Sequence, residues 1–270
     1  MRHYRTGLFA GAALAMVAFW VVMDGNTLDL GSLNLPTPRY FWFVGYWSAL
    51  GGLSAFLLAM ALAQSWGSLE RLPPVVRRLT EMPDTTFIVL TSVTALIIPL
   101  ALRTWVLHGA PVTDDESAYR FSAHLLASGR LWVQSPPMKE FFDQNFMIND
   151  GRLYPVYFLG WPALMVPGVW LHGTAFVNPL LSLATVWPLF RVVRHLSGSA
   201  WARGGIFLFL TAPFVQIAAA TELSHTSCLM ALTWALYFYL RSLDVSRRPQ
   251  HDVGLAASLA VAFFIRPASA

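Results

Sequence analysis

The stretch LYPVYFLGWPALMVPGVWLHGTAFVNPLLSLATVWPLF, residues 153–190, decides the topology expected for this chain. It contains no Asp, Glu, Lys or Arg. A membrane-spanning helix needs about 20 predominantly apolar residues, so the stretch is long enough for one crossing or two. Pro155, Pro162 and Pro167 make its first half a poor regular helix, because proline removes a backbone hydrogen bond and clashes with the preceding turn.

The distribution of arginine favours one crossing, at residues 178–193, with residues 153–172 outside the membrane or dipping into it. Cytoplasmic segments of membrane proteins are enriched in Lys and Arg. With one crossing, 11 of the 18 basic residues fall on the cytoplasmic side. They are Arg2, Arg5, Arg71, Arg77, Arg78, Arg191, Arg194, Arg203, Arg241, Arg247 and Arg248. A second crossing would place Arg191 and the basic residues after it in this list on the opposite side of the membrane.

The rest of the chain has the composition of a membrane protein. Charged residues make up 12% of it, against about 25% in ordinary globular chains. Further apolar runs occupy residues 6–23, 40–69, 85–102, 204–221, 223–240 and 253–265. We therefore expect an all-α polytopic membrane helix bundle with about seven crossings and a cytoplasmic N-terminus. A large extracytoplasmic loop, residues 110–176, would carry short interfacial helices.

Three segments are expected along the chain: two membrane helices in residues 1–69, a cytoplasmic linker in 70–86, and a third segment in 87–270. The last apolar run stops in mid-pattern at Ala270, which indicates the front part of a longer protein. The basic residues are scattered between apolar runs, which argues against nucleic-acid binding. Cys228 is the single cysteine, so an intrachain disulfide is excluded.

The outer loop opens with an acidic segment, residues 113–119, that predicts a short amphipathic helix ending at Gly129. Thr113 and Glu116 have the spacing of a capping box, so the acidic residues could serve the helix start alone. Alternatively, a carboxylate held at this helix start could act as a general base toward a hydroxyl, or bind a cation. Tyr119 lies one turn after Asp115, on the same face.

Two further groups of polar residues have a structural and a functional interpretation. Lys139 and Arg152, with the nearby aromatics, could anchor the chain at the membrane interface or bind the phosphate of a lipid-linked substrate. Glu222 and His225 lie three residues apart at an outer helix boundary. They could simply face water, or form a functional ionisable pair in an apolar chain. The histidines show no metal-ligand spacing, so no cofactor is expected, although carboxylates could bind a divalent metal.

A series of short motifs resembles, in its order, the N-terminal half of the GT-C superfamily of membrane glycosyltransferases. The resemblance is strongest to the branch with the aminoarabinose transferases of lipid A and the protein O-mannosyltransferases, and it covers residues 87–270. The motifs are Asp115-Glu116-x-x-Tyr119, Gly151-Arg152-Leu153-Tyr154-Pro155, Gly160-Trp161-Pro162, Val177-Asn178-Pro179-Leu180-Leu181, Arg191-x-x-Arg194-x-x-x-Gly198, Ala212-Pro213-Phe214, Ser224-His225 and Arg266-Pro267.

The resemblance implies an inverting transfer of a sugar from a polyprenyl-phosphate donor to an extracytoplasmic lipid, glycan or protein acceptor. It assigns the catalytic base to Asp115, with Glu116 in support, and a substrate-binding role to Glu222 and His225. Many relatives carry Lys or Gln where this chain has Val156, which leaves the donor phosphate to Arg152 or Lys139. Tyr119 completes the expected site.

The implied location is a bacterial-type inner (plasma) membrane, with membrane lipids and the lipid-linked donor as partners and the active site extracytoplasmic. An alternative function is a transporter or flippase, in which Arg103, Glu222 and Arg266 would be gating or coupling charges. A non-catalytic assembly subunit is a third hypothesis.

Overall fold

The computed structural model describes residues 78, 81–244 and 248–267, and its contacts divide the chain after Arg78. The unit Leu79–Ala270 contains the described residues from Glu81 onward. The expected crossings at residues 6–23 and 40–69, the cytoplasmic N-terminus and most of the linker lie outside the described residues. The division itself falls within the expected linker, residues 70–86.

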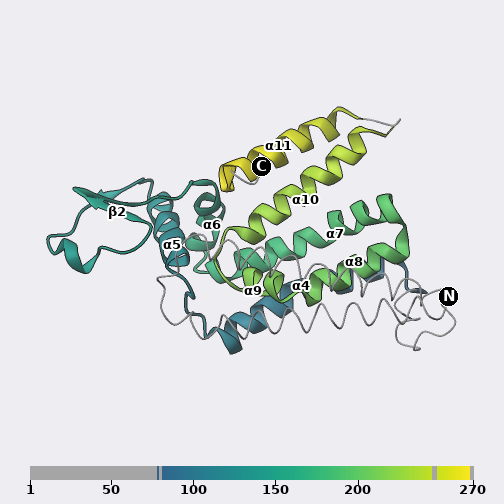
Figure 1. Cartoon of the computed structure of the whole chain (residues 1–270), viewed down its shortest axis with the longest axis horizontal. Coiled ribbons are helices and arrows are strands. Elements are labelled where there is room, and N and C mark those ends of the chain that lie inside the picture. Colours follow the sequence, from purple (N-terminus) through teal and green to yellow (C-terminus); the bar gives the residue numbers. More distant parts are fainter. Residues whose placement is uncertain (1–77, 79–80, 245–247, 268–270) are drawn as a thin grey trace, which may run out of the picture. The chain divides into compact units, whose positions relative to one another are not determined.

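The described part is mostly helical, with a small sheet at one end (Figure 1). Its helices are α4 (Asp84–Ala101), the π-helical turn η2 (Leu102–Val106), α5 (Asp114–Ala127), the 3-10 turn η3 (Lys139–Phe141), α6 (Gly160–Trp170), the 3-10 turn η4 (Thr174–Phe176), α7 (Val177–Ser197), α8 (Ser199–Thr211), α9 (Pro213–Ala220), α10 (His225–Ser242) and α11 (Pro249–Ile265).

The sheet has three antiparallel strands, β1 (Val133–Gln134), β2 (Met147–Asp150) and β3 (Arg152–Pro155), in the order β1-β3-β2. Val133 pairs with Leu153, and Ile148 pairs with Tyr154. Gly151 connects β2 to β3 with a φ of 71°, in the left-handed region where glycine lacks the Cβ penalty.

The prediction of an all-α bundle with seven crossings is wrong. The sheet interrupts the helical pattern between α5 and α6. Among the described residues, two helices are long and apolar enough to cross a membrane, Asp84–Val106 and Thr174–Ser197. The bent pair α8 and α9 raises the number to three if it forms one span.

Local chemistry explains why the other apolar runs in the described residues do not form single helices long enough to cross. The run at residues 204–221 breaks at Pro213, with a bend of 57° between α8 and α9. Proline lacks an N–H and forces the preceding residue, Ala212, out of the helical region, and Ala212 has a ψ of 113°. Polar residues at both ends of α10 shorten its apolar length, and α11 has only 17 residues.

The single crossing expected in residues 153–190 agrees with the helix lengths. Residues 174–197 form one of the two candidate spans, whereas α6 has 11 residues and is about 16 Å long at 1.5 Å per residue. The first half nevertheless contains a regular helix, α6, despite its prolines. Pro162 lies in its first turn, where the missing N–H has no intrahelical partner anyway.

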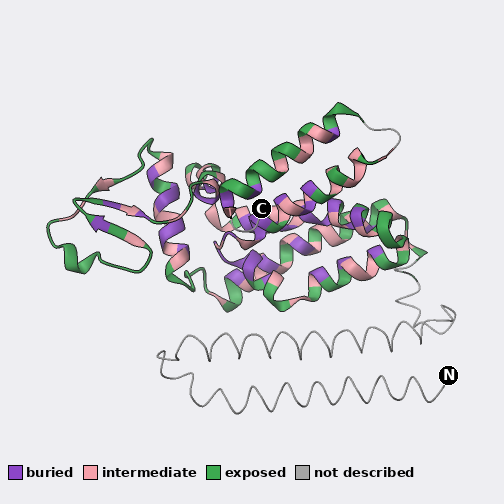
Figure 2. Cartoon of the chain, turned by 45° about the horizontal axis from the view of Figure 1, so that its top comes forward, coloured by how far each residue is buried: buried purple, intermediate pink, exposed green. Residues whose placement is uncertain are grey.

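Two hydrophobic cores hold this unit together, and Figure 2 shows their buried residues on the inner faces of the helices. The first joins α4, α7 and α8 through Phe87, Ala95, Val186, Phe190, Ala202, Ile206 and Phe209. The second joins α5, α6, α10 and α11 through Tyr119, Ala123, Trp161, Met165, Cys228 and Ile265. The second core positions the polar residues at the starts of α5 and α10.

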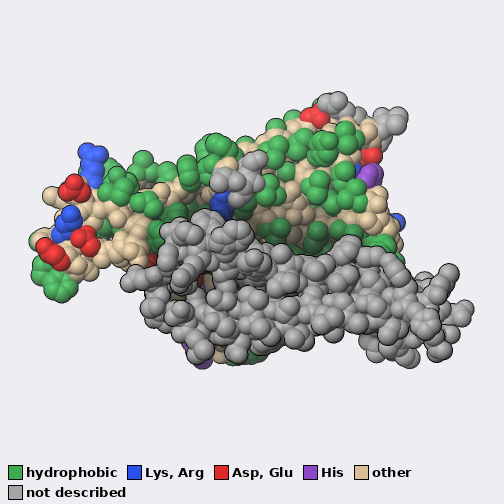
Figure 3. Space-filling model, in the orientation of Figure 1, with side chains coloured by type: hydrophobic (Ala, Val, Ile, Leu, Met, Phe, Trp, Pro, Cys, Tyr) green, Lys and Arg blue, Asp and Glu red, His purple; other side chains and the backbone are tan. Residues whose placement is uncertain are grey.

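Exposed apolar side chains lie on the outer faces of α10 and α11, whereas charged side chains gather over the sheet and near the far ends of the helices (Figure 3). Leu236 and Tyr239 on α10 and Phe263 and Phe264 on α11 are examples. Large exposed apolar patches mark interaction with membranes or partners. The outer faces of α10 and α11 therefore offer a surface for contact with a membrane or a partner.

Candidate functional site

Glu222 lies at the centre of a buried ion-pair network in the turn between α9 and α10. Its carboxylate accepts hydrogen bonds from Arg103 Nη2 at 3.1 Å and from Arg120 Nε at 2.8 Å. Thr174 Oγ1 donates a third at 2.9 Å. Glu222 is 2% exposed, and its hydrogen bond with Arg120 raises the pKa of that guanidinium. The network therefore ties η2, α5 and η4 to the turn.

Glu116 has a structural role that the sequence did not predict. Its two carboxylate oxygens accept from the backbone N–H of Val112 and of Glu222, each at 2.8 Å. Thr113 precedes α5 but makes no side-chain cap hydrogen bond, so the expected capping box does not form. The side chain of Glu116 is completely buried, and it fixes the start of α5 to the turn at Glu222.

One amide side chain and one indole side chain hold the main chain of the same turn. Asn178 Nδ2 donates to the carbonyls of Thr221 at 2.7 Å and Leu223 at 2.8 Å. Trp161 Nε1 donates to the carbonyl of Glu222 at 2.7 Å. In the sequence, Asn178 and Trp161 stand out only as members of the motifs quoted above. Their roles follow from polar groups that must find partners when buried.

A second, half-buried cluster begins at Asp115, the residue before Glu116 in α5. The Tyr157 hydroxyl donates to Asp115 Oδ1. Tyr157 packs on Tyr119 with ring centroids 4.4 Å apart, and the Tyr119 hydroxyl lies 3.2 Å from Ser224 Oγ. Burial raises the pKa of both tyrosine hydroxyls. They therefore stay protonated near neutral pH and can donate to a carboxylate.

His225 begins α10 beside this cluster. Burial lowers the pKa of its imidazole, and the positive charge of Arg266 lowers it further, while Asp115 opposes both effects. The ring meets Phe214 edge-on at 5.7 Å between centroids. Nδ1 is buried and has no hydrogen-bond partner in the described part of the chain. His225 is therefore neutral at neutral pH.

Arg266 follows the last residue of α11, Ile265, which packs in the same core as Tyr119. Its charge acts on Tyr119, Tyr157 and His225. The backbone of Phe264 and Ile265 lies against Gly160, so closely that a Cβ at Gly160 would collide with it. Glycine at the start of α6 therefore allows α11 to bring Arg266 to the site.

The structure brings together some of the expected site residues and separates others. Asp115, Tyr119 and His225 belong to one cluster, with Tyr157, Ser224 and Arg266. Glu116 and Glu222 belong to the buried network.

Lys139 and Arg152 lie in the sheet region, and in the described structure neither side chain forms a hydrogen bond or ion pair with either group. Lys139 is exposed in η3, and Arg152 lies 4.4 Å from the ring centroid of Trp132. The described residues include no group of three or more His, Cys, Asp or Glu side chains that could hold a metal ion.

The arrangement offers a carboxylate, a neutral imidazole, three hydroxyls and a guanidinium in one place. Asp115 Oδ2 accepts no hydrogen bond from the residues that the structure describes, so it can accept a proton or a ligand hydroxyl. Arg266 can neutralise an anionic group. No protein-family model, curated protein or solved structure matches this chain.

Proposed function

We propose that this protein is an inverting glycosyltransferase that uses a polyprenyl-phosphate sugar donor, with Asp115 as its general base. The observation that carries the proposal is the half-buried Asp115 carboxylate, which accepts a hydrogen bond from the Tyr157 hydroxyl. The positive charge of Arg266 acts on the same cluster. A base and a cation in one cluster suit a reaction that takes a proton from one group and releases an anion.

In the proposed step, an acceptor hydroxyl attacks the anomeric carbon of the donor sugar. The new C–O bond forms as the bond from that carbon to the phosphate oxygen breaks, and the phosphate keeps the electron pair. Asp115 accepts the hydroxyl proton, and the charge of Arg266 stabilises the departing phosphate. Tyr157 orients the carboxylate through its hydrogen bond.

This proposal changes the expected division of roles. Arg266 takes the role of phosphate ligand that was expected of Arg152 or Lys139, because among these three described cations Arg266 is the one whose charge acts on the Asp115 cluster. Glu116 becomes a positioning residue, since both its oxygens are occupied by backbone amides. Transport through moving charges is the weaker alternative, because Glu222 already accepts from Arg103, Arg120 and Thr174.

Mass spectrometry of cell-envelope glycans and polyprenyl-phosphate sugars, in a deletion strain and its parent, tests the function. We expect an altered glycan and accumulated donor in the deletion strain. The strain is then complemented with Asp115→Asn or Asp114→Asn. Asp114 is an exposed neighbour that bonds Asn145 at 3.0 Å, so its variant serves as the matched control.

Asp114→Asn should restore the glycan, and Asp115→Asn should lower the transfer rate by about 10²–10⁴-fold, the usual contribution of a general base. An unaltered profile in the deletion strain would reject the transferase. Full restoration by Asp115→Asn, at equal protein levels, would reject Asp115 as the base.

A further inference from the structure

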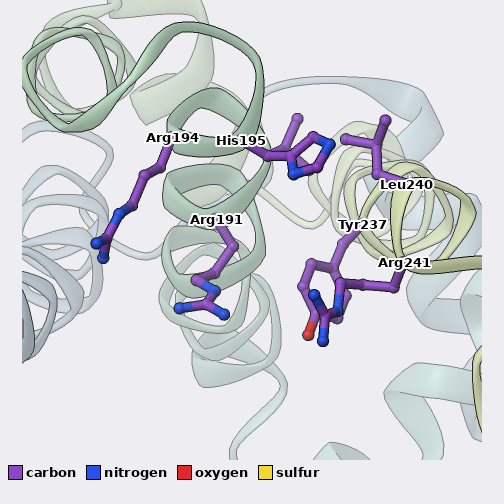
Figure 4. A pocket seen from close by; sticks show the side chains of 7 residues that line it. Arg191, Arg194, His195, Tyr237, Leu240 and Arg241 are labelled. Carbon is purple, nitrogen blue, oxygen red and sulfur yellow. The ribbon is translucent and has the colours of Figure 1, made fainter. Parts of the chain in front are cut away.

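A second polar site, independent of the Asp115 cluster, is a pocket of about 290 Å³ between the last turns of α7 and α10 (Figure 4). Its lining comprises Arg191, Val192, Arg194 and His195 from α7, and Tyr237, Leu240 and Arg241 from α10. Asn178, at the other end of α7, bonds the turn at Glu222. Arg191 follows Asn178 by 13 residues, or about 20 Å along a helix.

Three arginines line the pocket, and one of them, Arg191, has no carboxylate partner among the described residues. Arg194 pairs with Asp84, and Arg241 pairs with Asp244 at 2.6 Å. Arg191 lies 5.8 Å from the ring centroid of Trp187 and pairs with no carboxylate in the described part of the chain.

The side chains converge on one side of the pocket. In Figure 4, Arg191 and Arg241 come from different helices and extend to the same side as the Tyr237 hydroxyl, whereas Arg194 turns away. Arg241 Nε is buried and finds no hydrogen-bond partner among the described residues. A guanidinium group only donates hydrogen bonds. The pocket therefore presents several donors, of which the buried Arg241 Nε has no acceptor in the described structure.

We propose that this pocket binds a terminal phosphate group. The group is either the phosphate monoester of a lipid headgroup or inorganic phosphate. Arg191 and Arg241 supply the charge and planar donor forks that match phosphate oxygens, and the Tyr237 hydroxyl supplies a further donor. Arginines that only set the orientation of a membrane helix would not need to point toward the same side of one pocket. The pocket adjoins the last turn of the candidate span Thr174–Ser197, at the depth where headgroup phosphates lie.

The first experiment measures lipid retention by native mass spectrometry, using the full chain in nanodiscs of phosphatidylcholine with a minor fraction of phosphatidate. The wild type should retain phosphatidate in preference to phosphatidylcholine. Arg191→Gln/Arg241→Gln should reduce that retention about tenfold or more, since a hydrogen bond to a charged group is worth about 1.5–3 kcal/mol. Arg130→Gln, an exposed arginine near the sheet, should leave it unchanged.

A second experiment distinguishes the two sources of phosphate, by calorimetric titration of inorganic phosphate into protein in pure phosphatidylcholine nanodiscs. If the wild type binds inorganic phosphate, the double variant does not, and phosphatidate is not retained, the ligand is free phosphate. If the wild type retains phosphatidate but does not bind inorganic phosphate, the ligand is a lipid headgroup.

The proposal is overturned if the wild type shows neither preference nor binding. Equal behaviour of wild type and double variant, or an equal loss in Arg130→Gln, also overturns it. If the double variant does not fold, Arg191→Gln alone gives the same readout, because Arg191 forms no ion pair in the described structure.

Discussion

Asp115 and Glu116 are adjacent in the chain, but their carboxylates have different surroundings. Glu116 is completely buried and accepts from two backbone amides. Asp115 is half-buried and accepts from the Tyr157 hydroxyl. Successive residues of a helix point in directions about 100° apart, so one packs inward while the other reaches the second cluster. Residue type alone does not separate a structural acid from a candidate base.

At the residue scale, His225 makes the stability of the folded protein depend on pH. It lies outside the candidate membrane spans, and burial, then Arg266, lowers the pKa of its imidazole below the ordinary value. Between that lowered pKa and about 6.5, the unfolded chain binds a proton that the folded chain does not. The contribution to stability is therefore complete above about pH 6.5 and is lost as the pH falls.

We expect the thermal midpoint of the wild type in detergent to fall more between pH 7.5 and 5.5 than that of His225→Gln. His124→Gln, at an exposed position on α5, should behave like the wild type. The same pH dependence in all three proteins would show that His225 does not titrate differently on folding.

At the scale of elements, the turn between α9 and α10 is the hub of the unit. Glu222, Asn178 and Trp161 connect it to η2, α5, α6, η4 and α7 through bonds between residues far apart in sequence. A connection of this kind fixes where α10 begins. It therefore also fixes the positions of Ser224 and His225 in the Asp115 cluster.

Removing the charge of Glu222 should destabilise this hub strongly. Glu222→Gln leaves Arg103, with a side chain 7% exposed, as an uncompensated buried charge, and breaking a buried pair typically costs about 3–5 kcal/mol. Thermal or denaturant unfolding in detergent measures the loss. Asp244→Asn removes a partly exposed pair just after the end of α10 and should cost about 0–1 kcal/mol. Equal losses in the two variants would contradict the hub.

The contact between α6 and α11 gives a second prediction at this scale. In Gly160→Ala, the new Cβ would collide with the backbone of Phe264 and Ile265, and α11 would have to move. We expect a loss of about 1–3 kcal/mol in unfolding free energy, the usual cost of overpacking, together with a loss of activity as Arg266 is displaced.

Gly204→Ala is the control for this change. A Cβ at Gly204 on α8 meets nothing within 4 Å, and alanine is favoured over glycine in a helix by about 1 kcal/mol. Gly204→Ala should therefore leave stability unchanged or raise it. A Gly160→Ala protein as stable and active as Gly204→Ala would show that α11 can shift without harm.

At the scale of the whole molecule, α7 separates the Asp115 cluster from the arginine pocket. Its 21 residues give a length of about 31 Å, close to the roughly 30 Å thickness of a hydrocarbon core. If α7 spans the bilayer, the two sites face opposite compartments. The substrates of a reaction at the Asp115 cluster and the phosphate bound at the arginine pocket would then enter from different sides of the membrane.

Labelling with a membrane-impermeant thiol reagent in intact cells tests this arrangement. Val112→Cys lies at the exposed start of the α5 region, and Ser197→Cys is the exposed last residue of α7. We expect one of the two to react in intact cells and the other only after permeabilisation. Wild-type protein should not react, because Cys228 is buried. Reaction of both from the same side would show that α7 does not cross.

The sequence by itself determined the features that depend on neighbouring residues. Hydropathy and the distribution of arginine predicted the two described helices that can span a membrane, but hydropathy also predicted crossings in residues 223–240 and 253–265, which are not candidate spans. Gly129 ended α5 as expected, with a φ of 72°. The acidic segment at residue 115 and the turn at residue 222 were recognised as polar positions in an apolar chain. Strands of two to four residues are too short to show a period, so the sheet was missed.

Only the tertiary structure decided which polar residues act together. The bond from Glu222 N–H to Glu116 joins residues 106 positions apart, and the ion pair of Arg103 with Glu222 joins residues 119 apart. Burial separated Glu116 from Asp115, and the packing of α11 on α6 brought Arg266 to the cluster. Local propensities set helices one at a time, whereas the burial and pairing of a side chain depend on segments that meet only when the chain has folded.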